Sequence, residues 1–318
     1  MGSLSRPRKG SLQVWPRKRV SKYLPSVNWS VIPSENSKGL KAFICYKAGM
    51  ASAYVKDNTP NSMTKDKSIT IPVTILECPP MKILSVRFYK HSKVAKDVLS
   101  ENLDKELKRK IKVPKTNKIK LESVKTEDYD DVSVIVYSQV KKIGLKKTPD
   151  LTEVGVAGNS LEEKLAWIKG NINKELSVSD IFGPKKLVDL RGLTKGKGFQ
   201  GPIKRFGAKL RFHKTEKGRR KIGSIGPWHP ARVTFRVPMA GQMGLFTRII
   251  YNNKIIAMNK ANEKPLKGIK NYGDVNGDYI LVYGSVQGPA KRQLLLTAPL
   301  RKTRKQEKKD YDLLRLMR

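Results

Sequence analysis

The stretch of sequence that decides the fold runs from Leu187 to Lys221 and is LVDLRGLTKGKGFQGPIKRFGAKLRFHKTEKGRRK. Leu187 to Leu190 is apolar and typical of a strand, whereas Lys195 to Lys221 is rich in glycine and positive charge and poor in apolar periodicity. A segment of that composition cannot bury a face of its own. We therefore expect a folded region that continues into an extension, which something other than its own core must order.

The whole chain carries the same excess of positive charge. Its 318 residues include 66 Lys plus Arg against 27 Asp plus Glu, a formal net charge of +39, and 38% of them are hydrophobic. This balance excludes a neutral soluble enzyme as the default and indicates a polyanionic partner, either nucleic acid or an anionic membrane. No apolar run is long enough to span a bilayer, and the first twenty residues lack the apolar segment of a secretory signal.

The charge is distributed unevenly, and this divides the chain into segments. Residues 90–180 hold 19 basic and 15 acidic residues, whereas residues 181–260 hold 19 basic and two acidic ones. The N-terminal stretch is basic and interrupted by prolines, which favours an extended arm. The predicted domains are a basic N-terminal extension (1–38), a first β part (39–90), an inserted α/β domain (91–184), a second β part (185–300) with a basic extension at about 204–236, and a charged tail (301–318).

Apolar periodicity predicts the secondary structure of the folded parts. Helical spacing of apolar residues predicts a helix over 94–111, and Ser160 to Glu163 forms a capping box that starts another. The end of the tail is also predicted to be helical. Strand patterns are found at 39–55, 69–77, 83–89, 132–140, 233–237, 247–251 and 279–286. A mixed α/β fold follows from these elements.

The glycines after residue 192 raise the question of a nucleotide site. Gly196, Gly198 and Gly201 match the dinucleotide-binding pattern, but that motif needs a helix opening at the last glycine and an acid about 20 residues later. The sequence has Pro202 and a basic run there instead, and it does not fit a phosphate-binding Walker loop either. The alternatives are a plain surface turn, or a flexible loop whose backbone passes close to phosphates with Lys195 and Lys197 beside it.

The basic run combines cations with aromatic residues. Lys204 to Lys221 places nine cations beside one acid, Glu216, and a solvated face or a disordered tail could have the same charge. Phe199, Phe206, Phe212 and Trp228 are interleaved with the cations, the combination that binds phosphates while stacking on exposed bases. Trp228 could be an ordinary core residue, but Pro227 and Pro230 flank it, which favours a hairpin tip exposed toward RNA.

Residues that could carry catalysis or a metal are few. No nucleophile has a neighbouring base, and the acids from Glu127 to Asp131 lack the glycine and final Glu of a calcium loop. Cys45 and Cys78 fit small buried side chains in a reducing compartment, and with three histidines they cannot make a zinc finger. We expect no catalytic residue, no metal and no cofactor. An RNA-modifying enzyme and a free RNA chaperone are the alternatives to a structural RNA-binding protein.

A specific resemblance then emerges from the signature residues. The chain resembles the universal large-subunit ribosomal protein of the L-three family at nine positions across 24 residues, which are Phe182, Asp189, Gly192, Thr194, Gly196, Lys197, Gly198, Gly201 and Arg205. Gly223 to Gly226 and Met239 to Gly244 are two further blocks that look like this family. The Trp228-His229-Pro230 run and the insert resemble the archaeal and eukaryotic branch, and the modest tail looks archaeal.

The resemblance implies a translation-type β-barrel split by an α/β insert, with long irregular basic extensions. It also implies a structural role in the large subunit of the cytoplasmic ribosome, with no membrane and no small-molecule substrate. The protein would bind and organise large-subunit ribosomal RNA, contact neighbouring ribosomal proteins and support subunit assembly. Its extension would reach toward the peptidyl transferase centre, with Trp228 near the entry route of aminoacyl-tRNA. Glu216 stands where eukaryotic relatives can carry a modified histidine, so we do not expect that modification.

The predicted RNA-binding residues belong to the arm, the glycine-rich loop and the basic extension. We expect the arm and the extension to be disordered without RNA, because they cannot bury enough apolar area to offset the entropy of ordering the backbone. The predicted residues are Arg6, Arg8, Lys9, Arg17, Lys18, Arg19, Lys195, Lys197, Lys204, Arg205, Lys209, Arg211, Lys214, Arg219, Arg220, Lys221, Trp228, His229, Arg232 and Gln242.

Overall fold

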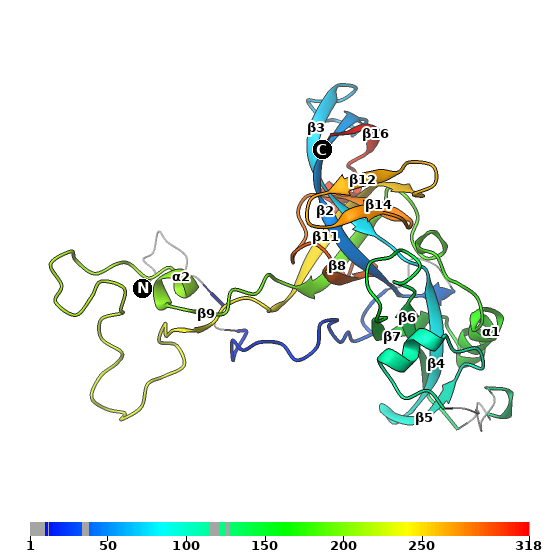
Figure 1. Ribbon diagram of the computed structural model, residues 1–318, viewed down its shortest axis with the longest axis horizontal. Helices are drawn as coiled ribbons and strands as arrows, with labels where there is room; N and C mark the ends of the chain where they lie inside the picture. Colours follow the sequence, from blue (N-terminus) through cyan, green and yellow to red (C-terminus); the bar gives the residue numbers. More distant parts are fainter. Residues whose placement is uncertain (1–9, 12, 34–37, 115–120, 125–127, 318) are drawn as a thin grey trace. The chain divides into compact units, whose positions relative to one another are not determined.

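The computed structural model divides the chain into two compact units (Figure 1). The sheet unit comprises residues 24–192 and 249–318, and the extension unit comprises residues 1–23 and 193–248. Within them the structure describes residues 10–11, 13–33, 38–114, 121–124 and 128–317. Strands predominate, and α1 (Leu161–Asn171) is the only α-helix of more than five residues in this part of the chain. The fold is thus mostly β, with less helix than expected, and no helix of the described residues is long and apolar enough to cross a membrane.

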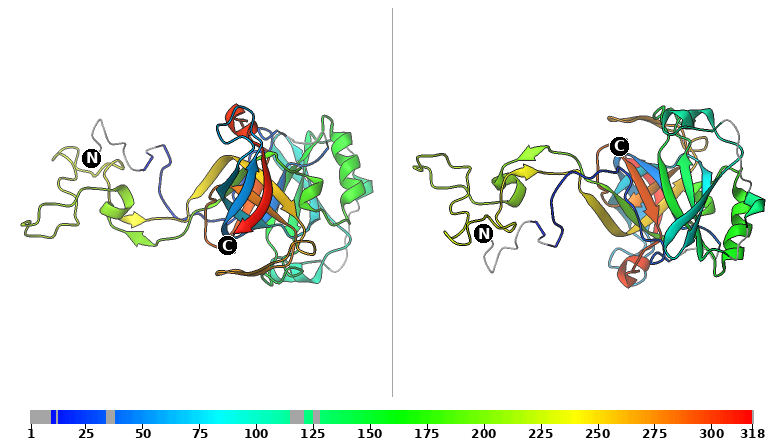
Figure 2. Two further views of the ribbon diagram at one scale, coloured as in Figure 1. Left: turned by 90° about the horizontal axis from the view of Figure 1, so that it is seen from above. Right: turned by 90° about the horizontal axis from the view of Figure 1, so that it is seen from below.

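The larger sheet of the sheet unit closes on itself (Figure 2). Its order is β15-β8-β11-β14-β3-β2-β16, and β15 also pairs with β2, so six strands form a ring and β16 is added beside β2. The long strand β2 makes this closure possible, because different parts of it pair with β15, β3 and β16. The strands are β2 (Ala42–Asp57), β3 (Ser68–Glu77), β8 (Leu187–Leu193), β11 (Thr247–Asn259), β14 (Tyr279–Tyr283), β15 (Gln293–Thr297) and β16 (Tyr311–Met317).

A second sheet combines three strands of the region predicted as an insert with β1 and β4 of the predicted first β part, and it shares the core of the ring. Phe43 of β2, Val134 of β6, Ile168 of α1 and Leu294 of β15 belong to one continuous cluster of buried side chains. Burial of this apolar surface is the main stabilising term for both sheets. The order of the second sheet is β1-β7-β6-β4-β5, with β1 (Gly39–Leu40), β4 (Met81–Lys90), β5 (Lys93–Leu99), β6 (Asp131–Ser138) and β7 (Leu151–Ala157).

The remaining elements are short. The sheet unit adds a hairpin of β12 (Leu266–Ile269) and β13 (Gly273–Val275), one turn of helix α3, and three single turns of 3-10 helix. The extension unit contains one turn of helix, α2, and one pair of two-residue strands, β9 and β10. The bounds are α2 (Pro202–Phe206), α3 (Arg304–Glu307), β9 (Phe199–Gln200), β10 (Gly241–Gln242), and 3-10 turns at Lys105–Arg109, Leu121–Ser123 and Val178–Asp180.

Several local predictions are confirmed. Ser160 caps α1, since its hydroxyl accepts a hydrogen bond from the Glu163 backbone N–H at 3.2 Å. The Glu163 carboxylate accepts from the backbone N–H of Asn159 rather than from that of Ser160, so the reciprocal half of the capping box is displaced by one residue. Cys45 and Cys78 are buried and not joined in a disulfide, and the buried strand predicted at 132–140 is β6.

Three predicted elements are wrong. The helix over 94–111 is strand β5 followed by one 3-10 turn, because residues 93–99 pair with the edge of β4. The end of the tail is strand β16 rather than a helix, since the outer half of β2 offers an edge that residues 311–317 complete. Residues 233–237 form an exposed turn, because Pro230 and Pro238 flank them and no described strand pairs with them.

The turn after β2 is held by one buried carboxylate. Asp57 accepts hydrogen bonds from the Thr59 backbone N–H and the Ser62 hydroxyl, each at 2.9 Å, and from the Thr64 hydroxyl at 2.5 Å. Burial alone would raise the pKa of Asp57, but these hydrogen bonds outweigh it and lower the pKa to about 2. The charged form of Asp57 therefore stabilises the turn.

We expect Asp57→Asn to destabilise the protein at neutral pH by about 1 kcal/mol, because an amide offers one acceptor where the carboxylate offers two. An unfolded Asp titrates near pH ~4. The folded-state pKa is lower, so the stabilisation is present above pH ~4 and is lost as the pH falls toward ~2. Urea unfolding of both proteins between these pH values measures the gap between their free energies of unfolding. A gap that stayed constant over this range would contradict the role of the charge.

Candidate nucleic-acid interface

The two glycine-rich blocks of the sequence form the base of the extension unit. The backbone N–H of Thr194 donates to Phe246 O at 3.1 Å, that of Lys197 to Met243 O at 2.9 Å, and that of Met243 to Gly198 O at 2.9 Å. β9 and β10 continue this antiparallel ladder. The two segments therefore run side by side although more than forty residues separate them.

Glycine is required at one position of this ladder. Gly244 has a φ of +78°, and a Cβ there would lie 1.9 Å from the carbonyl oxygen of Lys195. Any other residue would both clash with this backbone and adopt an unfavourable conformation. Gly244, the last residue of the block from Met239 to Gly244, thus allows close approach of two backbones within the protein.

Arg205 organises the extension unit from inside. It lies on α2, and its guanidinium donates hydrogen bonds to Gln242 O at 3.0 Å, Met239 O at 2.9 Å and Arg17 O at 3.3 Å. The Arg17 and Arg205 guanidinium carbons lie 4.5 and 5.1 Å from the centre of the Phe206 ring. Burial lowers the pKa of Arg205. This side chain was predicted to bind RNA, but three of its N–H groups donate hydrogen bonds to backbone carbonyls of the protein itself.

The helix that carries Arg205 was not expected. α2 begins at Pro202 with Gly201 as its N-cap, and it ends at Gly207, whose φ of 63° is left-handed. It is a single turn, and the residues after it are basic rather than acidic. The prediction that no helix opens after the glycines is therefore wrong, while the absence of the ribose-binding acid still argues against a dinucleotide site.

An aromatic contact also joins the N-terminal arm to the rest of the extension unit. The rings of Trp15 and Phe235 lie 5.4 Å apart at an interplanar angle of 49°. The backbone N–H of Val20 donates to Leu245 O at 3.3 Å. The described arm residues up to Tyr23 thus belong to the same unit as the basic extension, whereas those from Leu24 onward belong to the sheet unit, where Leu24 joins the buried core.

Residues 207–240, all of which are described, contain neither helix nor strand. Apart from the bond that Met239 O accepts from Arg205, their hydrogen bonds are local. The backbone N–H of Arg211 donates to Arg219 O at 3.1 Å, and the Arg211 guanidinium donates to Ile222 O. The aromatic side chains are exposed, with Phe212 at 67% and Trp228 at 88% of full exposure. These large apolar rings are therefore not parts of a core, and their faces are accessible.

The predicted RNA-binding residues divide into three groups. Arg6, Arg8 and Lys9 lie outside the described residues. Arg17, Arg205, Arg211 and Gln242 are half-buried and bond to backbone carbonyls of the extension unit. The exposed group consists of Lys18, Arg19, Lys195, Lys197, Lys204, Lys209, Lys214, Arg219, Arg220, Lys221, Trp228, His229 and Arg232.

Two further cations were left out of the prediction. Lys217 and Arg236 are exposed in the same segment, and the Arg236 guanidinium carbon lies 5.9 Å from the Phe235 ring centre. Their charge and their position in the basic run were the signal that could have found them.

The electrostatics of the two units differ. In residues 193–248 the only acid is Glu216. Ion pairs gather instead in the sheet unit, where Arg87 contacts Asp97 and Glu153 at 2.9 Å each. The positive charge of the extension is thus left for an external anion to neutralise.

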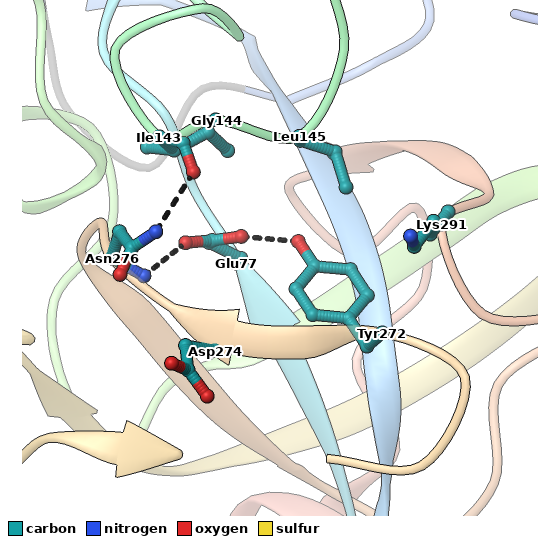
Figure 3. Close-up of a pocket in the computed structure, with 8 residues that line it drawn as sticks. All are labelled: Glu77, Ile143, Gly144, Leu145, Tyr272, Asp274, Asn276 and Lys291. Atoms are coloured by element: carbon teal, nitrogen blue, oxygen red, sulfur yellow. Dashed lines mark hydrogen bonds between the residues drawn. The ribbon is translucent and has the colours of Figure 1, made fainter. Parts of the chain in front are cut away.

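The polar side chains that line the cavity in Figure 3 hold the backbone of the protein rather than form a catalytic site. It measures about 260 Å³, and its buried Glu77 accepts hydrogen bonds from the Tyr272 hydroxyl and from the Asn276 and Gly277 backbone N–H groups. Burial raises the pKa of Glu77, although these donors oppose the shift. The carboxylate anchors the turn between β13 and β14. Among the described residues no three His, Cys, Asp or Glu side chains are placed to hold a metal ion.

We expect Arg205→Ala to loosen the extension unit, because three carbonyls lose a charged donor. Hydrogen exchange at the Lys197 and Met243 amides should accelerate roughly tenfold, equivalent to about 1.4 kcal/mol. Arg205→Lys should restore only part of the protection, since one ammonium cannot reproduce the planar fork. Lys204→Ala is the matched control, because it removes the neighbouring positive charge from an exposed side chain. Equal exchange rates in all four proteins would show that Arg205 does not hold the unit together.

Comparison with known proteins identifies the family. The model of the family described as ribosomal protein L3 matches residues 1–316. The protein called large ribosomal subunit protein uL3 in Methanocaldococcus jannaschii is 40% identical over 314 residues, covering 94% of this chain and 92% of that protein. Its counterparts in Methanococcus vannielii and Methanosphaera stadtmanae are 42% and 40% identical, covering 93% and 94% of this chain and 92% and 93% of their own lengths. The chain therefore belongs to the ribosomal protein L3 family.

Proposed function

We propose that this protein is a structural constituent of the large subunit of the cytoplasmic ribosome, where it binds and organises large-subunit ribosomal RNA. The observation that carries the proposal is the extension unit, in which exposed cations and aromatic rings lie on a backbone without helix or strand from 207 to 240. L3 proteins are structural and not enzymes, so an RNA-modifying enzyme is no longer an alternative.

The mechanism we propose is replacement of counterions. Lysines and arginines of the extension displace the cations condensed on the RNA, and the release of those ions drives binding. Exposed arginines such as Arg219 and Arg232 fork two donors onto one phosphate or stack on a base, while lysines act as point charges. Phe212 and Trp228 provide faces for unpaired bases.

The resemblance suggests a finer placement. The central extension, at about 204–236, would reach toward the peptidyl transferase centre, with Trp228 beside the entry route of aminoacyl-tRNA. The closed ring of six strands supports its assignment as a translation-type β-barrel formed by residues 39–90 and 185–300 and interrupted by an insert at 91–184. In this proposal the arm and the extension support subunit assembly, and other ribosomal proteins contact the sheet unit.

The salt dependence of RNA binding tests the mechanism. If about ten cations contact phosphates, the logarithm of the affinity should fall with the logarithm of the salt concentration with a slope of roughly −7 to −9. Fluorescence anisotropy with a large-subunit RNA fragment measures this slope. A slope near zero would rule out counterion release. Sedimentation separates a stable subunit component from a free chaperone, because only the former migrates entirely with the large subunit.

Trp228→Ala should weaken binding to RNA with unpaired bases by roughly 5- to 150-fold, since stacking on one base contributes about 1–3 kcal/mol. The same change should leave the thermal unfolding of the protein unaltered, because Trp228 is 88% exposed. Trp167→Ala is the control in the opposite direction, since Trp167 packs against the main core and its loss should lower stability without a specific effect on RNA. A marked fall in melting temperature for Trp228→Ala would show that this tryptophan supports the fold.

A further inference from the structure

We propose that residues 301–309, here called the C-terminal basic segment, form a second RNA-binding surface that contacts the phosphate backbone of double-stranded RNA. The segment belongs to the sheet unit and is separate in sequence from the extension. This inference rests on the proposed function, and it adds a site and a class of RNA that the extension does not explain.

The start of the segment is fixed by the ring. The backbone N–H of Leu300 donates to the carboxylate of Asp189 at 2.9 Å, and Asp189 is fully buried on β8. The Asn252 side chain donates to the Thr303 hydroxyl at 2.9 Å. Buried Lys254 of β11 donates to Glu307 O, the last residue of α3, at 3.1 Å. The segment is therefore bonded to two strands of the ring.

The end of the segment is fixed by the turn after β2, beside which α3 is drawn in Figure 2. The backbone N–H of Asn58 donates to Asp310 O at 2.9 Å, and that of Asp310 donates to the Thr59 hydroxyl at 3.1 Å. Lys185 pairs with the carboxylates of Asp310 and Asp312 at 2.8 and 2.7 Å. The two acids that follow the segment thus share one lysine of the same unit, which offsets part of their negative charge.

The cations of the segment are displayed outward. Arg301, Arg304, Lys305 and Lys308 are exposed, and Arg304 and Lys308 lie four residues apart across the single turn of α3. Glu307 is the only acid from 301 to 309. Because the backbone is already fixed at both ends, binding an anion here costs less ordering entropy than binding to the irregular extension.

The composition of the segment selects the ligand. Residues 301–309 are RKTRKQEKK and include no apolar or aromatic side chain. A protein partner would be expected to meet aromatic or apolar anchors at the centre of an interface, and unpaired bases would be expected to meet rings for stacking. Neither is available here. Fixed cations alone match the regularly spaced phosphates of a duplex, which are contacted without reading sequence.

The test uses the full chain with Arg301, Arg304, Lys305 and Lys308 all changed to Gln. The probes are an RNA duplex of about 20 base pairs and a single-stranded oligouridylate of the same length, titrated at several salt concentrations. The variant should bind the duplex at least roughly tenfold more weakly at ~0.1 M salt, with a slope less steep by about 3 to 4, and should lose less than about threefold on the single strand.

The matched control removes the same charge elsewhere. Lys108, Arg109, Lys110 and Lys112 are exposed cations of the near-neutral region, and changing them all to Gln should alter duplex binding by less than about threefold. Equal losses in the two quadruple variants would overturn the site, because the effect would then be net charge alone. Crosslinking of Lys305 to a protein in assembled subunits, with duplex binding unchanged in the variant, would also overturn it.

The two proposals fail in different ways. Trp228→Ala should weaken single-strand binding while leaving duplex binding close to that of the parent protein, the reverse of the C-terminal variant. If neither RNA binds with a steep salt dependence, the proposed function fails. If Trp228→Ala weakens single-strand binding as expected, but the two quadruple variants bind the duplex equally well, only the second surface is refuted.

Discussion

A net charge of +39 limits how this chain can fold, because most of its cations have no acid of the same chain to meet. The sheet unit contains nearly all of the Asp and Glu residues, and its buried acids hold its own backbone. Asp189 accepts from two backbone N–H groups, and Glu77 holds the turn between β13 and β14. Residues 193–248 contain a single acid, Glu216, so ion pairs do not hold this segment together. The division into two units follows this separation of charge.

The energetic balance of the extension supports the proposal that RNA orders it. Fixing one residue of backbone costs about 1–2 kcal/mol, so ordering residues 207–240 costs on the order of tens of kcal/mol. Each internal hydrogen bond returns about 1 kcal/mol, and most of those formed there join residues only two or three positions apart. The base of the unit is better bonded, through the ladder at Lys197 and Met243 and the three carbonyl contacts of Arg205. In the proposed function, phosphate contacts stabilise the rest of the extension.

Sequence reasoning succeeded where the deciding interaction is local. The hydroxyl of Ser160 bonds three residues away, and the prolines beside Trp228 keep it out of a core element. It failed where the deciding partner is distant in sequence. Residues 311–317 became a strand because β2 offered an edge more than 250 residues earlier, and residues 94–98 joined β4 against their helical spacing. The role of Arg205 was hidden for the same reason, since its acceptors lie at Arg17, Met239 and Gln242.

The extension also separates its two kinds of cation by chemistry. The side-chain bonds from its cations to backbone carbonyls come from arginines: Arg17 to Ser11, Arg205 to three residues, and Arg211 and Arg219 to their own loop. A guanidinium has five donors in a plane and is weakly hydrated, so it can join several carbonyls in a partly buried position. An ammonium keeps its water, and the lysines from Lys195 to Lys221 are all exposed. Charge alone therefore overestimates the set of exposed cations, because several arginines are half-buried and shape the extension itself.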